Sequence, residues 1–158
     1  DVLIKAAKQM PDVKFFWVGG IPFKNLGADY NAMQDMIKNA PNNLTVTGVI
    51  PLENVRDYYV AADVFVLPAM QENHPMCVLE AAGAGLPIIL RDIPQYNDTF
   101  KGDAVMAKTD DEFLELISKL RKDKKAYKKA QLGAEKIAER FDSSAGAERL
   151  VEFYRSLI

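Results

Sequence analysis

The residues best suited to chemistry lie in one stretch, from Leu67 to Pro87. Two glutamates, Glu72 and Glu80, are separated by seven residues, and the pattern predicts that a helix begins between them near Pro75. The first amides of a helix have no partner within it and lie at the positive end of its dipole. The stretch therefore predicts an anion site suited to a diphosphate, with an acidic side chain on each side of it.

Each residue type in this stretch suits a particular contact. Proline has no N–H group, so the candidate amide donors are those of Met76, Cys77 and Val78. Glu72 can contact a sugar hydroxyl or a developing cationic centre, and Glu80 can accept hydrogen bonds from a ribose diol. An alternative interpretation is that Glu72 is a solvated loop residue and Glu80 a surface helix residue. Cys77 is expected to be a small buried residue rather than a nucleophile.

Short apolar runs alternate along the chain with helical patterns. Runs without polar alternation predict strands buried on both faces, as in parallel sheets, at 15–18, 44–47, 64–67, 87–90 and 104–106. Helices are expected at 1–10, 29–39, 52–62, 76–84, 111–120, 124–140 and 144–158. This alternation predicts an α/β fold with a doubly wound, Rossmann-like parallel sheet, in one lobe that spans 1–158.

Ligands of such sheets bind outside the carboxyl ends of the strands. Four loops occupy those positions, at 19–22, 48–51, 68–75 and 91–96. Glycine at the end of a strand can also serve only the geometry of a turn, so each loop alone is weak evidence for a site. Four loops at one edge of a sheet together predict a binding face.

Composition excludes several classes of function. The chain has 158 residues, a formal net charge of -2, one cysteine and one histidine. It therefore has no internal disulfide, no Cys/His zinc site and no basic field for nucleic acid, and a cytoplasmic protein is expected. No apolar run approaches the roughly 18 residues of a membrane span. The opening residues, Asp1 to Lys5, read as the interior of a helix, so the chain is expected to be part of a longer protein.

Three stretches share a pattern with a known family. Residues 15–22 form an apolar strand that ends in V-G-x-x-P, residues 46–68 carry G-x-x-P followed by Y-x-x-A-D-x-F-x-x-P, and the two glutamates precede A-x-x-x-G-x-P at 81–87. In this order and spacing, the whole chain resembles the C-terminal lobe of retaining nucleotide-sugar glycosyltransferases of group 1, family 4, which have the GT-B fold.

The resemblance implies a fold, a donor and roles for the site residues. The fold is the C-terminal half of a GT-B fold without its first strand. The donor is a nucleotide sugar, with UDP-glucose expected, and neither a metal nor a cofactor is required. Glu72 is the catalytic residue beside the donor sugar, and Glu80 binds the ribose. The other donor-binding residues are Gly19, Gly48, Val49, Ile50, Asn73, His74, Met76, Cys77 and Val78.

The sequence departs from the family pattern in two ways. Asn73-His74-Pro75 replaces the usual G-F-G, and this form, with residues 91–96, is similar to a branch that includes bacterial diacylglycerol glucosyltransferases. The family's first strand, with the arginine and lysine that clamp the diphosphate, would precede Asp1, and so would the N-terminal lobe that receives the acceptor. The isolated fragment is therefore expected to be inactive. His74 is either a polar surface residue or a hydrogen-bond partner of the donor sugar or acceptor.

Other functions remain open at this point. A non-catalytic GT-B-like binding module, or a sugar-nucleotide epimerase or phosphorylase of the same architecture, would share these motifs. Between 118 and 129, one acid, Asp123, accompanies a run of basic residues, which are Lys119, Arg121, Lys122, Lys124, Lys125, Lys128 and Lys129. This run is either a solvated helix end or a weak contact with anionic lipid. The second interpretation predicts a peripheral enzyme at the inner membrane leaflet, with a glycolipid acceptor.

Overall fold

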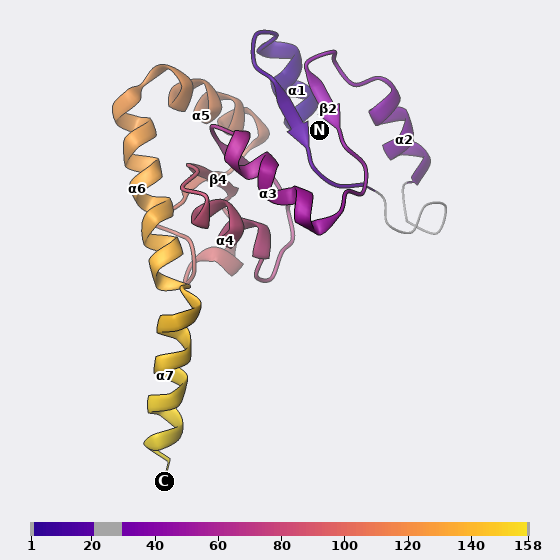
Figure 1. Cartoon of the computed structure of the whole chain (residues 1–158). Helices are drawn as coiled ribbons and strands as arrows, with labels where there is room; N and C mark the ends of the chain where they lie inside the picture. Colours follow the sequence, from indigo (N-terminus) through magenta and orange to yellow (C-terminus); the bar gives the residue numbers. More distant parts are fainter. Residues whose placement is uncertain (1, 21–29, 158) are drawn as a thin grey trace. The chain divides into compact units, whose positions relative to one another are not determined.

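The computed structural model describes residues 2–20 and 30–157, with the side chains of 32 and 33 excepted. The chain divides into two compact units, unit 1 over Asp1–Ala61 and unit 2 over Ala62–Ile158. Figure 1 shows strands and helices alternating in both units. The expectation that 1–158 forms a single lobe stays a prediction.

Unit 1 is built on two parallel strands. Its described elements follow the order α1 (Val2–Gln9), β1 (Phe15–Trp17), α2 (Tyr30–Lys38), β2 (Leu44–Val46) and α3 (Leu52–Ala61). In the β1–β2 register, Phe15 pairs with Leu44 and both are buried. The Asn43 amide group donates to the carbonyl oxygens of Ala7, Met10 and Val13 at 2.8–3.0 Å. One side chain thus holds the end of α1 and the following loop against the start of β2.

Unit 2 contains a three-stranded parallel sheet in the order β3-β4-β5. The strands are β3 (Phe65–Leu67), β4 (Ile88–Arg91) and β5 (Val105–Ala107). The short 3₁₀ helix η2 (Pro94–Tyr96) follows β4. Every residue of β4 is buried, whereas β3 is half-buried along its length. The central strand has neighbours on both sides, so it carries the core of this unit.

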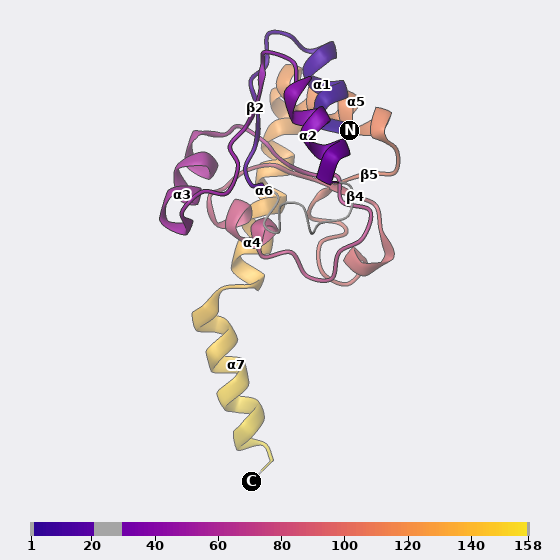
Figure 2. The same cartoon turned by 90° about the vertical axis from the view of Figure 1, so that its right-hand side faces the viewer.

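Four helices complete unit 2, and three of them cover its sheet. They are α4 (Met76–Gly83), α5 (Asp110–Lys122), α6 (Lys124–Arg140) and α7 (Ser143–Arg155). α6 packs against α4, α5 and β4, and α5 packs against β5. Figure 2 shows the same helices from the side. α7 buries none of its residues, and its exposed apolar side chains include Leu150, Val151, Phe153 and Tyr154.

Local sequence rules account for the helix ends. α4 ends in a Schellman motif, in which the Gly85 amide donates to Ala82 O and the Leu86 amide to Ala81 O, with Gly85 at φ 74°. α5 begins with a side-chain cap, because the Thr109 hydroxyl accepts from the Glu112 amide. Asp123 ends α5 and caps α6, accepting from the amides of Lys125 and Ala126.

The α/β fold with parallel strands is confirmed, and the ends of each described strand and α-helix lie within three residues of the expected ones. Two details differ. The described strands pair in two sheets, β1-β2 and β3-β4-β5, rather than in one. Burial on both faces holds for β4, but Phe16 and Thr45 are exposed in the β1-β2 pair. A two-stranded pair has no central strand, so alternate side chains can remain open to solvent.

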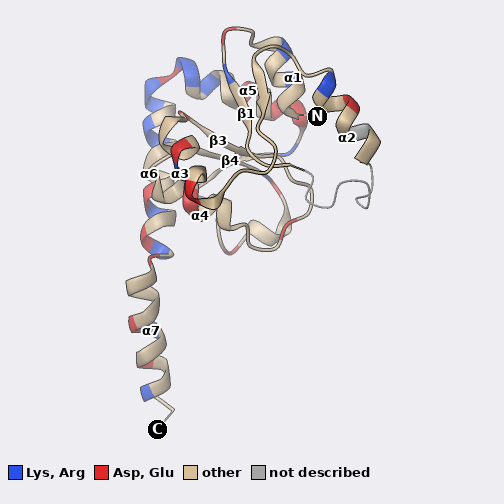
Figure 3. Cartoon of the chain, turned by 45° about the vertical axis from the view of Figure 1, so that its right-hand side comes forward, with Lys and Arg blue, Asp and Glu red and all other residues tan. Residues whose placement is uncertain are grey.

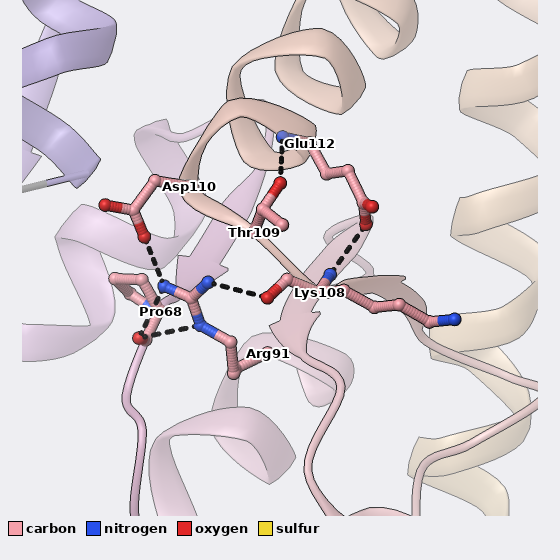
Figure 4. Close-up of polar contacts among 6 residues, drawn as sticks. All are labelled: Pro68, Arg91, Lys108, Thr109, Asp110 and Glu112. Carbon is pink, nitrogen blue, oxygen red and sulfur yellow. Dashed lines mark hydrogen bonds and ion pairs between the residues drawn. The ribbon is translucent and has the colours of Figure 1, made fainter.

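A buried arginine joins the carboxyl ends of all three strands of unit 2 (Figure 4). Arg91, the last residue of β4, donates from Nε and Nη2 to Pro68 O after β3, at 3.4 and 3.3 Å. Its Nη1 donates to Lys108 O after β5 at 3.3 Å, and its Nη2 forms an ion pair with Asp110 at 2.7 Å. The guanidinium also lies over the Phe113 ring, 4.7 Å from the centroid. These contacts compensate for burial of the charge.

Arg91→Met should reduce the free energy of unfolding by about 3 kcal/mol, because it leaves two carbonyl groups and Asp110 without their charged partner. Urea unfolding measures this change. Lys101→Met is the matched control, because Lys101 pairs with Asp92 at 3.3 Å but is 51% exposed. The control should lose under about 1 kcal/mol. Equal losses in the two variants would contradict the structural role of Arg91.

Candidate functional site

The N-terminus of α4 has no side-chain cap. Pro75 is the N-cap residue, in an extended conformation, and no side-chain hydrogen bond closes this end of the helix. Helices usually satisfy their first amides with a Ser, Thr, Asp or Asn side chain. The helix was expected to begin near Pro75, and Pro75 lies one position before its first residue. The helix therefore starts at Met76 with amides directed out of its end.

Two of the three expected amide donors have no role in the helix itself. Met76 and Cys77 are its first residues, where an α-helix provides no carbonyl partner. The Val78 amide differs, because it donates to Pro75 O at 3.1 Å and its side chain is fully buried. Met76 is exposed and Cys77 is half-buried. The amides of Met76 and Cys77 are thus the better candidates for anion contact.

Both predicted glutamates act on the same thiol. Burial raises the pKa of Cys77, and the negative charges of Glu72 and Glu80 raise it further, while the amides of Cys77 and Val78 lower it. Because this interaction weakens with distance, the two carboxylates lie within electrostatic range of the thiol at the start of α4. Glu72 is half-buried in the loop after β3, and Glu80 is exposed on the helix. With its pKa raised, Cys77 stays a neutral thiol at pH 7, as expected of a residue that is not a nucleophile.

The altered turn, Asn73-His74-Pro75, is anchored by aromatic rings. The His74 ring stacks on Phe100 at 5.6 Å between centroids and lies tilted against Phe141 at 5.2 Å. Phe100 in turn meets Tyr96 edge to face at 5.3 Å. We call these four residues the aromatic cluster. His74 and Asn73 are exposed, so the ring of His74 makes these contacts at the surface of the protein.

Two residues of this region were not predicted to have such a role. Arg91 and Tyr96 belong to the range 91–96, which was expected to be a loop at the carboxyl ends of the strands. Neither residue was given a role there. Arg91 holds Pro68, the first residue of the loop that carries Glu72. Tyr96 is fully buried, and burial raises its pKa to about 12, with the negative charge of Glu72, and that of Cys77 once its thiol has ionised, adding to the effect. The sequence signal for Arg91 was a charged residue directly after a run of continuous apolar residues, whereas no comparable signal marked Tyr96.

In unit 1 the two predicted glycine loops meet. Gly19 and Gly48 form an antiparallel bridge, and the Gly19 amide donates to Thr47 Oγ1 at 3.1 Å. Both glycines have left-handed backbone, with φ 136° and 70°. Val49 is 74% exposed beside this crossing, and Ile50 is half-buried. The remainder of the first loop, from Ile21, lies outside the described residues.

The described residues contain no group of three or more His, Cys, Asp or Glu side chains that could hold a metal ion. The expectation that neither a metal nor a cofactor is needed stays a prediction. No described helix combines the length and apolar character of a membrane span. The predicted basic run lies at the corner between α5 and α6, and all seven of its basic residues are exposed (Figure 3).

Comparison with known proteins gives consistent matches. The family described as Glycosyl transferases group 1 matches residues 1–137. The chain is 29% identical over 154 residues to an alpha-galactosylglucosyldiacylglycerol synthase of Streptococcus pneumoniae, covering 98% of this chain and 41% of that protein. It is 30% identical over 119 residues to a processive diacylglycerol alpha-glucosyltransferase of Acholeplasma laidlawii, covering 74% and 35%.

Solved structures agree on the fold. The Anabaena protein HepE, determined in complex with UDP-glucose, is 18% identical and superposes with a TM-score of 0.79, covering 98% of this chain and 44% of that one. The chain thus spans under half the length of these relatives. Its parallel α/β fold fits the C-terminal half of GT-B glycosyltransferases. The family match covers most of the chain, and the chain therefore belongs to the group 1 glycosyl transferases.

Proposed function

We propose that this chain is the donor-binding half of a retaining glycosyltransferase that transfers a hexose, with glucose as the first candidate, from a nucleotide sugar to an acceptor. The observation that carries the proposal is the placement of Glu72 and Glu80, whose charges both act on Cys77 at the uncapped start of α4. Membership of the family supplies the class of reaction.

The start of α4 is the proposed site of the donor diphosphate. The amides of Met76 and Cys77 and the positive end of the helix dipole suit an anion. During transfer the nucleoside diphosphate leaves and gains negative charge. Groups that already point at this charge stabilise the transition state without reorganisation.

The two carboxylates have different proposed roles. Glu72, half-buried in the loop before α4, lies beside the donor sugar and stabilises the positive charge that develops at the anomeric carbon. Glu80, exposed on the helix, accepts hydrogen bonds from the ribose hydroxyls. In unit 1, the crossing of Gly19 and Gly48, with Val49 and Ile50, is the proposed contact for the base.

A glycolipid acceptor at the cytoplasmic membrane face is the proposed partner. Two relatives are named for the synthesis of diacylglycerol glycolipids. The seven exposed basic residues at the α5–α6 corner suit anionic lipid headgroups, each at about 1 kcal/mol near a charged membrane. Asp123 caps α6 at this corner, so the basic side chains extend from ordered helix ends.

Glu80→Gln in the full-length protein should raise the KM for UDP-glucose about tenfold, because a charged hydrogen-bond acceptor for the ribose is lost. Glu72→Gln should mainly lower kcat, on the order of 100-fold, because it removes charge next to the reacting sugar. Steady-state transfer assays measure both constants. Glu115→Gln, at an exposed position on α5, is the matched control and should match the wild type. Wild-type kinetics in both site variants would refute this assignment.

Alkylation of Cys77, the one cysteine of this 158-residue chain, reports on the charges around the start of α4 when the modified site is identified by mass spectrometry. The raised pKa keeps the thiolate fraction small, so alkylation at pH 8 should be slower than for an exposed thiol. Glu72→Gln and Glu80→Gln each remove a charge that raises this pKa, so each should accelerate the reaction several-fold. UDP-glucose should protect the thiol in the full-length protein. Unchanged rates in both variants would place the carboxylates elsewhere.

Replacement of Lys124, Lys125 and Lys129 by Gln should weaken binding to vesicles of anionic phospholipid roughly 100-fold at low salt. Vesicle sedimentation of the full-length protein measures this affinity. Replacement of three exposed lysines of unit 1, Lys8, Lys14 and Lys38, changes the net charge equally and should have a smaller effect. Equal losses in the two triple variants would indicate a general charge effect rather than a lipid contact at the corner.

A further inference from the structure

Tyr96 carries a buried hydroxyl group without a partner. Its side chain is fully buried, and its oxygen has no hydrogen-bond partner among the described residues. A phenol in this state loses its hydrogen bonds to water and gains none in return. Tyr127 shows the usual alternative, since its hydroxyl donates to Asp63 O at 3.2 Å. The unpartnered hydroxyl group of Tyr96 thus lowers the free energy of unfolding, and a phenylalanine at this position would pack its ring equally well without that cost.

The aromatic cluster connects the Tyr96 ring to the loop that carries Glu72. The Tyr96 ring meets Phe100, and Phe100 stacks on His74, which is two residues after Glu72 in the same loop. The charge of Glu72 acts on both Tyr96 and Cys77, so the three side chains share one region. A phenol donates one hydrogen bond, and a carboxylate accepts several. Of the charged groups that act on Tyr96, Glu72 is the strong acceptor.

We propose that Tyr96 is a positioning residue of the donor site, whose hydroxyl group donates a hydrogen bond to the Glu72 carboxylate when the nucleotide sugar is bound. This inference rests on the proposed function. Glu72 is half-buried in a loop, at the boundary between solvent and the interior. The hydrogen bond would hold the carboxylate at one orientation beside the donor sugar, and charge-assisted bonds of this kind are short and directional.

The hydroxyl group of Tyr96 then has opposite effects in the two states: it destabilises the free protein and assists the bound one. In the free state the hydroxyl group has no partner, so Tyr96→Phe removes an unsatisfied polar atom and keeps the ring. Such a change should leave the melting temperature unchanged or raise it. In the bound state the same change removes the partner of Glu72 and should lower kcat about tenfold, with KM changed less than about twofold. A residue needed only for packing would not separate stability from turnover in this way.

The test compares Tyr96→Phe with Tyr127→Phe in the full-length protein. Tyr127→Phe removes a satisfied hydrogen bond away from the site, so it should lower the melting temperature and keep kcat. A double variant, Tyr96→Phe with Glu72→Gln, should be no slower than Glu72→Gln alone, because the two side chains act through one bond. Melting curves, kcat and KM with UDP-glucose are measured for all four variants and the wild type.

Three results would overturn the inference: wild-type kcat in Tyr96→Phe, a fall in kcat that accompanies an equal loss of stability as in a packing defect, or additive losses in the double variant. Failure of the proposed function is seen separately in the wild type. If UDP-glucose and other nucleotide sugars neither raise its melting temperature nor support transfer, the proposed function fails, and the inference about Tyr96 fails with it.

Discussion

The guanidinium group of Arg91 holds together the carboxyl ends of the strands of unit 2, where the loop of the candidate site begins. A buried charge is tolerated only when it is paired and hydrogen-bonded, and Arg91 has the carbonyls of Pro68 and Lys108, the Asp110 carboxylate and the Phe113 ring. These partners follow different strands, so a single side chain aligns three strand ends. The loop that carries Glu72 begins at this point, and its direction is set before any ligand contact is made.

The far end of the same loop is held by different means. The family resemblance implies glycines after the first glutamate, and glycine leaves the backbone free, whereas this chain has Asn73-His74-Pro75. The His74 ring packs on Phe100 and Phe141, and Pro75 is buried at the start of α4. Aromatic contacts of this kind contribute about 1 kcal/mol each beyond burial. Side-chain packing therefore holds this end of the loop, where glycines would leave the backbone free.

Local features of the fold were predictable from the sequence, and long-range features were not. The Schellman motif at Gly85 and the cap at Thr109 depend on residues within one turn, so short patterns indicate them. Arg91 escaped prediction because its partners lie 17 to 23 residues away in sequence. The division into two sheets depends on strand pairing, which periodicity does not specify. In the candidate site, the two glutamates could be chosen from spacing and family resemblance, whereas Tyr96 is identified by burial without a partner, which only coordinates reveal.

The crossing of the two glycine loops in unit 1 limits how this region can diverge. A Cβ atom at Gly20 would lie 2.8 Å from the Val49 amide nitrogen, and Gly48 has a backbone conformation that L side chains rarely adopt. Val49, by contrast, is widely exposed beside the crossing. Substitutions at position 49 should therefore change the folding free energy little. At positions 20 and 48, any residue other than glycine should destabilise the fold. New ligand preferences at this edge should arise by exchange of the neighbouring side chain on a conserved backbone.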